Sequence, residues 1–135
     1  MSRSAIYTVN GSPQTVVENG IINLGTIVRK FGCNLNLAGT GIQIAGPGYY
    51  RFDVSVTLAP DAVGNITVTA YEDNAPVQGA TATAAVETAN NPVNLDLSFV
   101  VRQSCSCCEG LSNLIFKVSE NAAEVTNIAI VGEKL

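Results

Sequence analysis

Cysteine is the residue type with the most varied chemistry in this sequence. Cys33 stands alone, whereas Cys105, Cys107 and Cys108 lie within four positions of the stretch QSCSCCEG. Thiolates hold zinc when they converge tetrahedrally, and the usual knuckle is C-x2–4-C rather than the C-x-C-C found here. Cys105 and Cys108 form a C-x-x-C, but no βαβ pattern surrounds them as it does in thioredoxin-like enzymes. Neither spacing therefore favours a zinc knuckle or a redox centre.

Two other roles for the cysteines differ in what they require from the rest of the chain. A nucleophilic cysteine needs a base, and the sequence contains no histidine. A disulfide from Cys33 to one of the other three, or a bridge between subunits, would stabilise the fold by ~2–4 kcal/mol. We rank structural thiols or disulfides first, a metal site second and catalysis last. The prediction is a protein that is not an enzyme and needs no cofactor, with a metal-dependent enzyme as the alternative.

The charged residues exclude one class of partner. The chain carries a formal net charge of −4, and its seven Lys and Arg residues are scattered along the sequence. Binding dominated by nucleic-acid phosphates needs a basic patch, so we expect no nucleic-acid partner. No apolar run reaches the ~18–20 residues of a transmembrane helix, and the N-terminus lacks the apolar core of a signal peptide. We expect synthesis in the cytoplasm, without membrane insertion, followed by incorporation into a virion or surface particle.

The composition bears on the surface of the protein. Hydrophobic residues make up 47% of the 135 residues and charged residues 13%, against about 25% charged in an average soluble domain. One interpretation is that another copy or a partner covers part of the surface. The other is that Thr, Asn, Ser and Gln build a neutral polar surface.

Alternation of apolar and polar residues is the main structural pattern. In YYRFDVSVTL, residues 49–58, Tyr50, Phe52 and Val54 point to one side, and Tyr49 and Arg51 point to the other, as in a half-buried strand. No stretch has sustained helical spacing. Further strands are expected at residues 5–9, 26–29, 34–37, 42–45, 65–72, 77–86, 93–101, 114–118 and 125–131. Glu18-Asn19-Gly20 predicts the turn of a hairpin between residues 15–17 and 21–24.

These segments predict the fold class. Roughly eight to ten strands with regular turn signals are typical of an all-β antiparallel sandwich or barrel. We expect residues 1–135 to form a single domain, with N-terminal strands and the hairpin in residues 1–40.

Three segments carry a resemblance to a known family. Residues 46–56, GPGYYRFDVSV, resemble the G-x-Y-x-F-x-x-x-V strand of C1q/TNF-like domains. Residues 66–77, ITVTAYEDNAPV, are similar to a later strand, turn and strand of that family, and residues 126–135, TNIAIVGEKL, to its closing strand. The small stand-alone members that this chain resembles are encoded by bacteria of the Firmicutes group and their phages.

The resemblance implies an all-β, antiparallel two-sheet jelly-roll sandwich with its core in residues 41–135. It also implies assembly as a homotrimer that acts as a head, fibre-tip or decoration domain. The candidates for the trimer interface are Tyr49, Tyr7 and Arg51. Loops at the exposed end of the trimer would bind a glycan or a cell-surface receptor, and the candidate ligand residues there are Asp61, Asn74, Asn90 and Asn91. We therefore expect a non-enzymatic structural or adhesion subunit of a phage virion or bacterial surface. The alternative is a monomeric carbohydrate-binding module.

Overall fold

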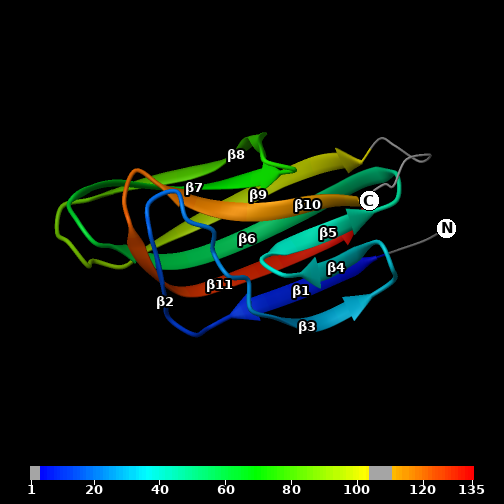
Figure 1. The fold of residues 1–135 in the computed structure, drawn as a ribbon, viewed down its shortest axis with the longest axis horizontal. Helices are drawn as coiled ribbons and strands as arrows, with labels where there is room; N and C mark the ends of the chain where they lie inside the picture. The colour runs from blue at the N-terminus through cyan, green and yellow to red at the C-terminus, as the bar shows by residue number, and fades with distance from the viewer. Residues whose placement is uncertain (1–3, 104–110) are drawn as a thin grey trace.

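The computed structural model describes residues 4–103 and 111–135, and these residues form eleven strands in two sheets (Figure 1). Both described ends of the chain lie at the same end of the elongated molecule, on the right in Figure 1. All pairings between the strands are antiparallel. The prediction of an all-β antiparallel sandwich is confirmed.

The larger sheet has six strands. Its order is β3 (Thr26–Phe31), β1 (Ala5–Asn10), β11 (Ala123–Lys134), β6 (Gly48–Pro60) and β9 (Val93–Gln103), and the short β2 (Gln14–Val16) also pairs with β11. We call the outward side of this sheet the A face.

The smaller sheet has five strands. Its order is β4 (Leu35–Ala38), β5 (Gly41–Ala45), β10 (Leu111–Ser119), β7 (Gly64–Glu72) and β8 (Ala75–Val86). We call its outward side the B face.

The core lies between the two sheets and follows the alternation of the sequence. In β6, Tyr50, Phe52, Val56 and Leu58 are fully buried, as their spacing predicts. The Phe52 and Phe99 rings stack at 5.6 Å between centroids, and Phe99 meets Phe116 of the other sheet at 6.3 Å. Burying a side chain of this size contributes roughly 1.5–3 kcal/mol. The aromatic residues therefore join the two sheets along the middle of the molecule.

One predicted local element is wrong. Residues 18–20 do form a turn, in which the Gly20 amide donates to the Val17 carbonyl at 2.8 Å. The flanking segments, however, do not pair with each other as a hairpin. β2 pairs with β11 of the larger sheet, whereas Ile21 bridges Lys117 of β10 in the smaller sheet. The turn passes the chain from one sheet to the other because each segment finds a longer partner strand there.

Candidate subunit interface

The A face carries exposed apolar side chains on four neighbouring strands. The sheet register places Tyr7, Val131, Asp53 and Ser98 side by side across β1, β11, β6 and β9. Tyr7 is 37% exposed and Val131 47% exposed. Val100, on the same side of β9, and Phe31, at the end of β3, are also exposed. Large apolar groups next to each other on a surface are typical of an interaction site.

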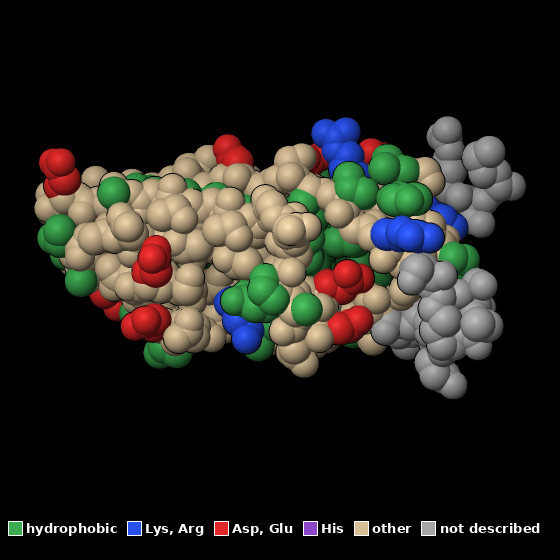
Figure 2. Space-filling model, turned by 90° about the horizontal axis from the view of Figure 1, so that it is seen from above, with side chains coloured by type: hydrophobic (Ala, Val, Ile, Leu, Met, Phe, Trp, Pro, Cys, Tyr) green, Lys and Arg blue, Asp and Glu red, His purple; other side chains and the backbone are tan. Residues whose placement is uncertain are grey.

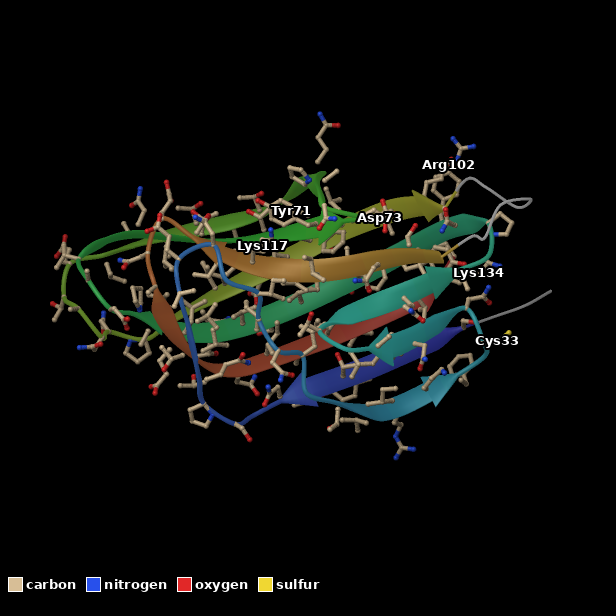
Figure 3. The ribbon with its side chains drawn as sticks, in the orientation of Figure 1. Cys33, Tyr71, Asp73, Arg102, Lys117 and Lys134 are labelled. Carbon is tan, nitrogen blue, oxygen red and sulfur yellow. The ribbon has the colours of Figure 1, made fainter. Side chains whose placement is uncertain are left out.

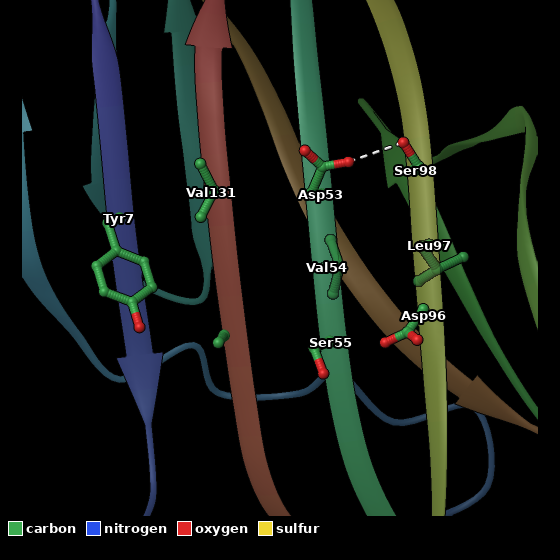
Figure 4. Close-up of a pocket in the computed structure, with 9 residues that line it drawn as sticks. Tyr7, Asp53, Val54, Ser55, Asp96, Leu97, Ser98 and Val131 are labelled. Carbon is green, nitrogen blue, oxygen red and sulfur yellow. Dashed lines mark hydrogen bonds between the residues drawn. The ribbon is translucent and has the colours of Figure 1, made fainter.

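Small side chains beside Tyr7 leave a hollow in this face. Figure 4 shows the Tyr7 ring on β1 and the groups of β6 and β9 on the other side of β11. The hollow measures about 450 Å³, and its floor is low because Ala129 and Ser55 occupy the row next to Tyr7. It is lined by Tyr7, Asp53, Val54, Ser55, Asp96, Leu97, Ser98, Ala129 and Val131.

A second, smaller hollow continues the same face toward β3. It measures about 170 Å³ and is lined mainly by apolar groups of Ala5, Ile6, Tyr7, Phe31 and Val131, together with Arg29 and Lys30. Tyr7 and Val131 line both hollows and so form a ridge between them. The A face thus has two hollows separated by a ridge, and the apolar side chains of another surface can pack into the hollows.

One group of charged side chains on the A face lies on β6 and β9. The Asp53 carboxylate accepts a hydrogen bond from the Ser98 hydroxyl at 2.8 Å, and the Arg51 Nε lies 3.6 Å from its other oxygen. Both partners of this ion pair are about half exposed, so it contributes little to stability as it stands. The Arg102 guanidinium lies 5.8 Å from the centroid of the Tyr49 ring. These groups are oriented but still open to solvent.

The three residues that the sequence suggested for an interface share this face. Tyr7, Arg51 and Tyr49 all lie on the outward side of the larger sheet, and Tyr49 is 53% exposed. Sequence reasoning missed Val131, Val100 and Phe31. Val100 was detectable, because in the pair Val100-Val101 one valine of a strand must face outward.

The four candidate ligand residues were expected at one end of the molecule, but the structure places them at two different ends. Asp61, Asn90 and Asn91 do lie together, because the Asn90 amide donates to the Pro60 carbonyl at 2.7 Å and the Asp61 amide to the Ala122 carbonyl at 2.9 Å. Asn74 lies in the turn between β7 and β8, at the other end of β7 from the loop that holds Asp61. Antiparallel strands place successive turns at opposite ends, so one end cannot hold all four residues. A residue missed at the Asp61 end is Asn121, whose amide donates to the Ala62 carbonyl at 2.8 Å.

The cysteine cluster largely falls outside the described residues. Cys105, Cys107 and Cys108 lie there, so their role as structural thiols or disulfides stays a prediction. Cys33 is exposed and has no disulfide partner among the residues that the structure describes. It lies near the end of the molecule where the described strands reach Gln103 and resume at Leu111, since Asn34 bonds to Ala45 and Ala45 pairs with Leu111 (Figure 3). In residues 4–103 and 111–135, no three His, Cys, Asp or Glu side chains come together as a metal site.

Among residues 4–103 and 111–135, burial shifts the pKa of two titratable groups, and both lie away from the A face. Burial raises the pKa of the Tyr50 phenol, whose hydroxyl donates to the Ala45 and Gly46 carbonyls, each at 2.9 Å. Burial also raises the pKa of the Glu72 carboxyl, and the charge of Asp73 adds to the effect. Neither group lines the two hollows of the A face.

No protein-family model and no curated protein matches the sequence. Solved structures do match the fold. Murine APRIL superposes with a TM-score of 0.75 over 99% of this chain and 100% of its own, at 12% identity. The globular domain of zebrafish complement 1qA protein gives a TM-score of 0.70 at 8% identity, over 97% of this chain and 95% of its own. This chain therefore has the jelly-roll fold of these two structures.

A viral protein shares the same fold. The PRD1 vertex protein P5 superposes on this chain with a TM-score of 0.59 at 14% identity, over 98% of this chain and 96% of its own. These low identities establish the fold of the domain and not its activity. Within the described part of the chain, no helix has the length and apolar character needed to cross a membrane.

Proposed function

We propose that this chain is a non-enzymatic structural or adhesion subunit that forms a homotrimer through the A face. The observation that carries the proposal is the exposed apolar surface of that face, with the Tyr7–Val131 ridge between two hollows. Three copies arranged in a closed ring would each cover part of a neighbour's A face. Burial of these side chains would account for a chain with so many apolar and so few charged residues.

The role in a particle rests on two further observations. The fold is shared with a viral vertex protein, which supports a place on a phage virion or a bacterial surface. The loops at residues 61–63, 87–92 and 120–122 lie at the end of the molecule opposite the described chain ends (Figure 1). A trimer attached through its chain ends would present those loops to a glycan or a cell-surface receptor.

The distribution of aromatic residues bears on the alternative, a monomeric carbohydrate-binding module. Four of the eight aromatic residues are buried in the core, and the Lys117 ammonium lies over the Tyr71 ring at 4.8 Å. The exposed rings are those of Tyr7, Tyr49 and Phe31. A glycan platform would have to use the same side of the sheet as the proposed trimer, so the two functions exclude each other there.

Light scattering of the purified protein tests the proposal, with and without reductant and chelator. We expect three times the 14.0 kDa chain mass, about 42 kDa, in every buffer. A trimer that dissociates in chelator or reductant would assign the assembly to a metal or to disulfides instead of the A face. A 14.0 kDa particle in all buffers would contradict the homotrimer and favour the monomeric carbohydrate-binding module.

A further inference from the structure

One end of the molecule carries acidic side chains and no basic ones. The loops at residues 61–63, 87–92 and 120–122 meet there, and none of them contains Lys or Arg. Figure 2 shows acidic side chains at the far left tip and no Lys or Arg at that tip. The exposed carboxylates of this end, which we call the acidic end, are Glu18, Asp61, Glu87, Glu120 and Glu124.

The opposite end carries cations. Three basic residues lie in the last two positions of their strands: Lys30 in β3, Arg102 in β9 and Lys134 in β11. Figure 3 shows Arg102 and Lys134 at this end of the molecule. Among the described residues, the one ion pair is that of Arg51 with Asp53, so these three cations have no carboxylate partner there. Glu133 is the carboxylate closest along the chain to Lys134. We call Lys30, Arg102 and Lys134 the basic end.

Both ends also expose apolar groups to solvent. Val63 is 64% exposed at the acidic end and Leu135 is 67% exposed at the basic end. The acidic end therefore offers an apolar side chain with carboxylates, and the basic end offers one with three cations and the exposed Glu133, which leaves an excess of positive charge. Such a surface fits a partner of opposite charge, and the matching surface lies on the same chain.

We infer that the acidic end of one copy docks on the basic end of another, so that subunits stack head to tail along their long axis. The contact is heterologous, because two different surfaces meet, and it can repeat without closing. It leaves the A face free and so goes beyond the proposed trimer. Within a stack, only the outermost copy presents its loops at residues 61–63, 87–92 and 120–122. The partner is a second copy, because charge complementarity on this one chain is sufficient to define it.

The salt dependence of the mass tests the stacking. The Debye length is about 30 Å at 0.01 M salt and about 3 Å at 1 M, so contacts between opposite charges weaken strongly over that range. We expect the mass measured by sedimentation at low salt to rise with protein concentration in whole multiples of the mass at high salt. A mass at low salt that does not change with concentration would overturn the inference. Because the multiples refer to the high-salt unit, the result is independent of whether that unit is a monomer or a trimer.

Charge-reversed pairs test the surfaces themselves. Asp61→Lys with Glu87→Lys and Glu124→Lys replaces three of the five carboxylates and makes the acidic end positive, and Arg102→Glu with Lys134→Glu makes the basic end negative. Each variant alone presents two ends of the same sign and should remain at the high-salt mass. An equimolar mixture of the two variants should stack again, because each variant then meets an end of opposite sign. A mixture that stays unstacked at low salt contradicts the inference, provided that both variants keep the melting temperature of the native protein.

A matched control separates local from overall charge. Gln78→Lys with Thr81→Lys adds positive charge on exposed positions of β8, away from both ends. This control should stack like the native protein, and loss of stacking in it would show that net charge alone governs association. Immobilised polylysine is the probe for a different cationic partner. Retention of native protein by polylysine, without any increase of mass in solution, would replace the second copy with a basic partner and overturn the inference.

Discussion

The two outward faces of this sandwich arise from the same alternating pattern. They differ in that outward polar groups of the B face form hydrogen bonds with each other, whereas the A face exposes apolar side chains. On the B face, the Thr67 hydroxyl lies 2.8 Å from that of Thr83 and donates to the Glu120 carboxylate at 2.7 Å. On the A face, the corresponding outward positions include Tyr7, Val100 and Val131, whose apolar side chains are exposed to solvent. A face whose polar groups bond to each other is suited to water, whereas an apolar face with hollows is suited to a partner.

The largest effect should come from a charge placed in the middle of the A face. Val131→Asp would bury an unpaired carboxylate in the proposed interface, which costs several kcal/mol. We expect light scattering to report the 14.0 kDa chain mass instead of the trimer. Thr69→Asp, at an outward position of the B face, is the matched control and should leave the trimer intact. Equal behaviour of the two variants would remove the distinction between the faces.

The second prediction concerns the packing of the core directly beneath the A face. A methyl group on Gly132 of β11 would lie 2.6 Å from the buried Phe52 ring. Overpacking of this kind typically costs about 1–3 kcal/mol, so Gly132→Ala should lower the free energy of unfolding by that amount. Chemical denaturation is the measurement. Gly11→Ala is the control, because its methyl group would meet no atom nearer than 3.9 Å.

The threonine pairs of the B face allow a smaller effect to be measured. Thr67→Val leaves the Glu120 carboxylate and the Thr83 hydroxyl without their shared partner, and we expect a loss of about 1–2 kcal/mol. Thr69→Val should cost much less, because the Thr69–Thr81 pair is exposed and longer, at 3.3 Å. The oligomeric mass should stay unchanged in both. If the two variants unfold at the same denaturant concentration, the Thr67 network does not stabilise this face.

The smallest effect concerns Glu72 and depends on pH. Because burial raises the pKa of Glu72 in the folded state, the unfolded chain loses this proton first as pH rises. Stability should therefore fall between the ordinary pKa of glutamate, about 4.3, and the raised value, and stay lower above it. Glu72→Gln should then melt at a higher temperature than the native protein at pH 7, with the difference vanishing below pH ~4. Glu124→Gln, at an exposed position, is the control, and an equal gain in that variant would argue against burial as the cause.

The sequence by itself determined the strands and their inner side. Alternation in β6 identified Tyr50 and Phe52 as core residues and Tyr49 as outward-facing, because a strand offers only two sides to its side chains. The same short-range pattern, with the three matching segments, was sufficient for the C1q/TNF-like fold. The position of a strand and the direction of its side chains depend on residues that are close in the sequence, so both can be predicted from the sequence alone.

The tertiary structure decided which outward residues meet. Only the order β1-β11-β6-β9 brings Tyr7 beside Val131 and Asp53, residues more than 40 positions apart in the sequence. It also separated Asn74 from Asp61, and it sent the two sides of the turn at Asn19 to different sheets. The physical reason is that strand order and the ends of long strands are set by pairing between distant segments, whereas alternation within a strand reports only its own two sides.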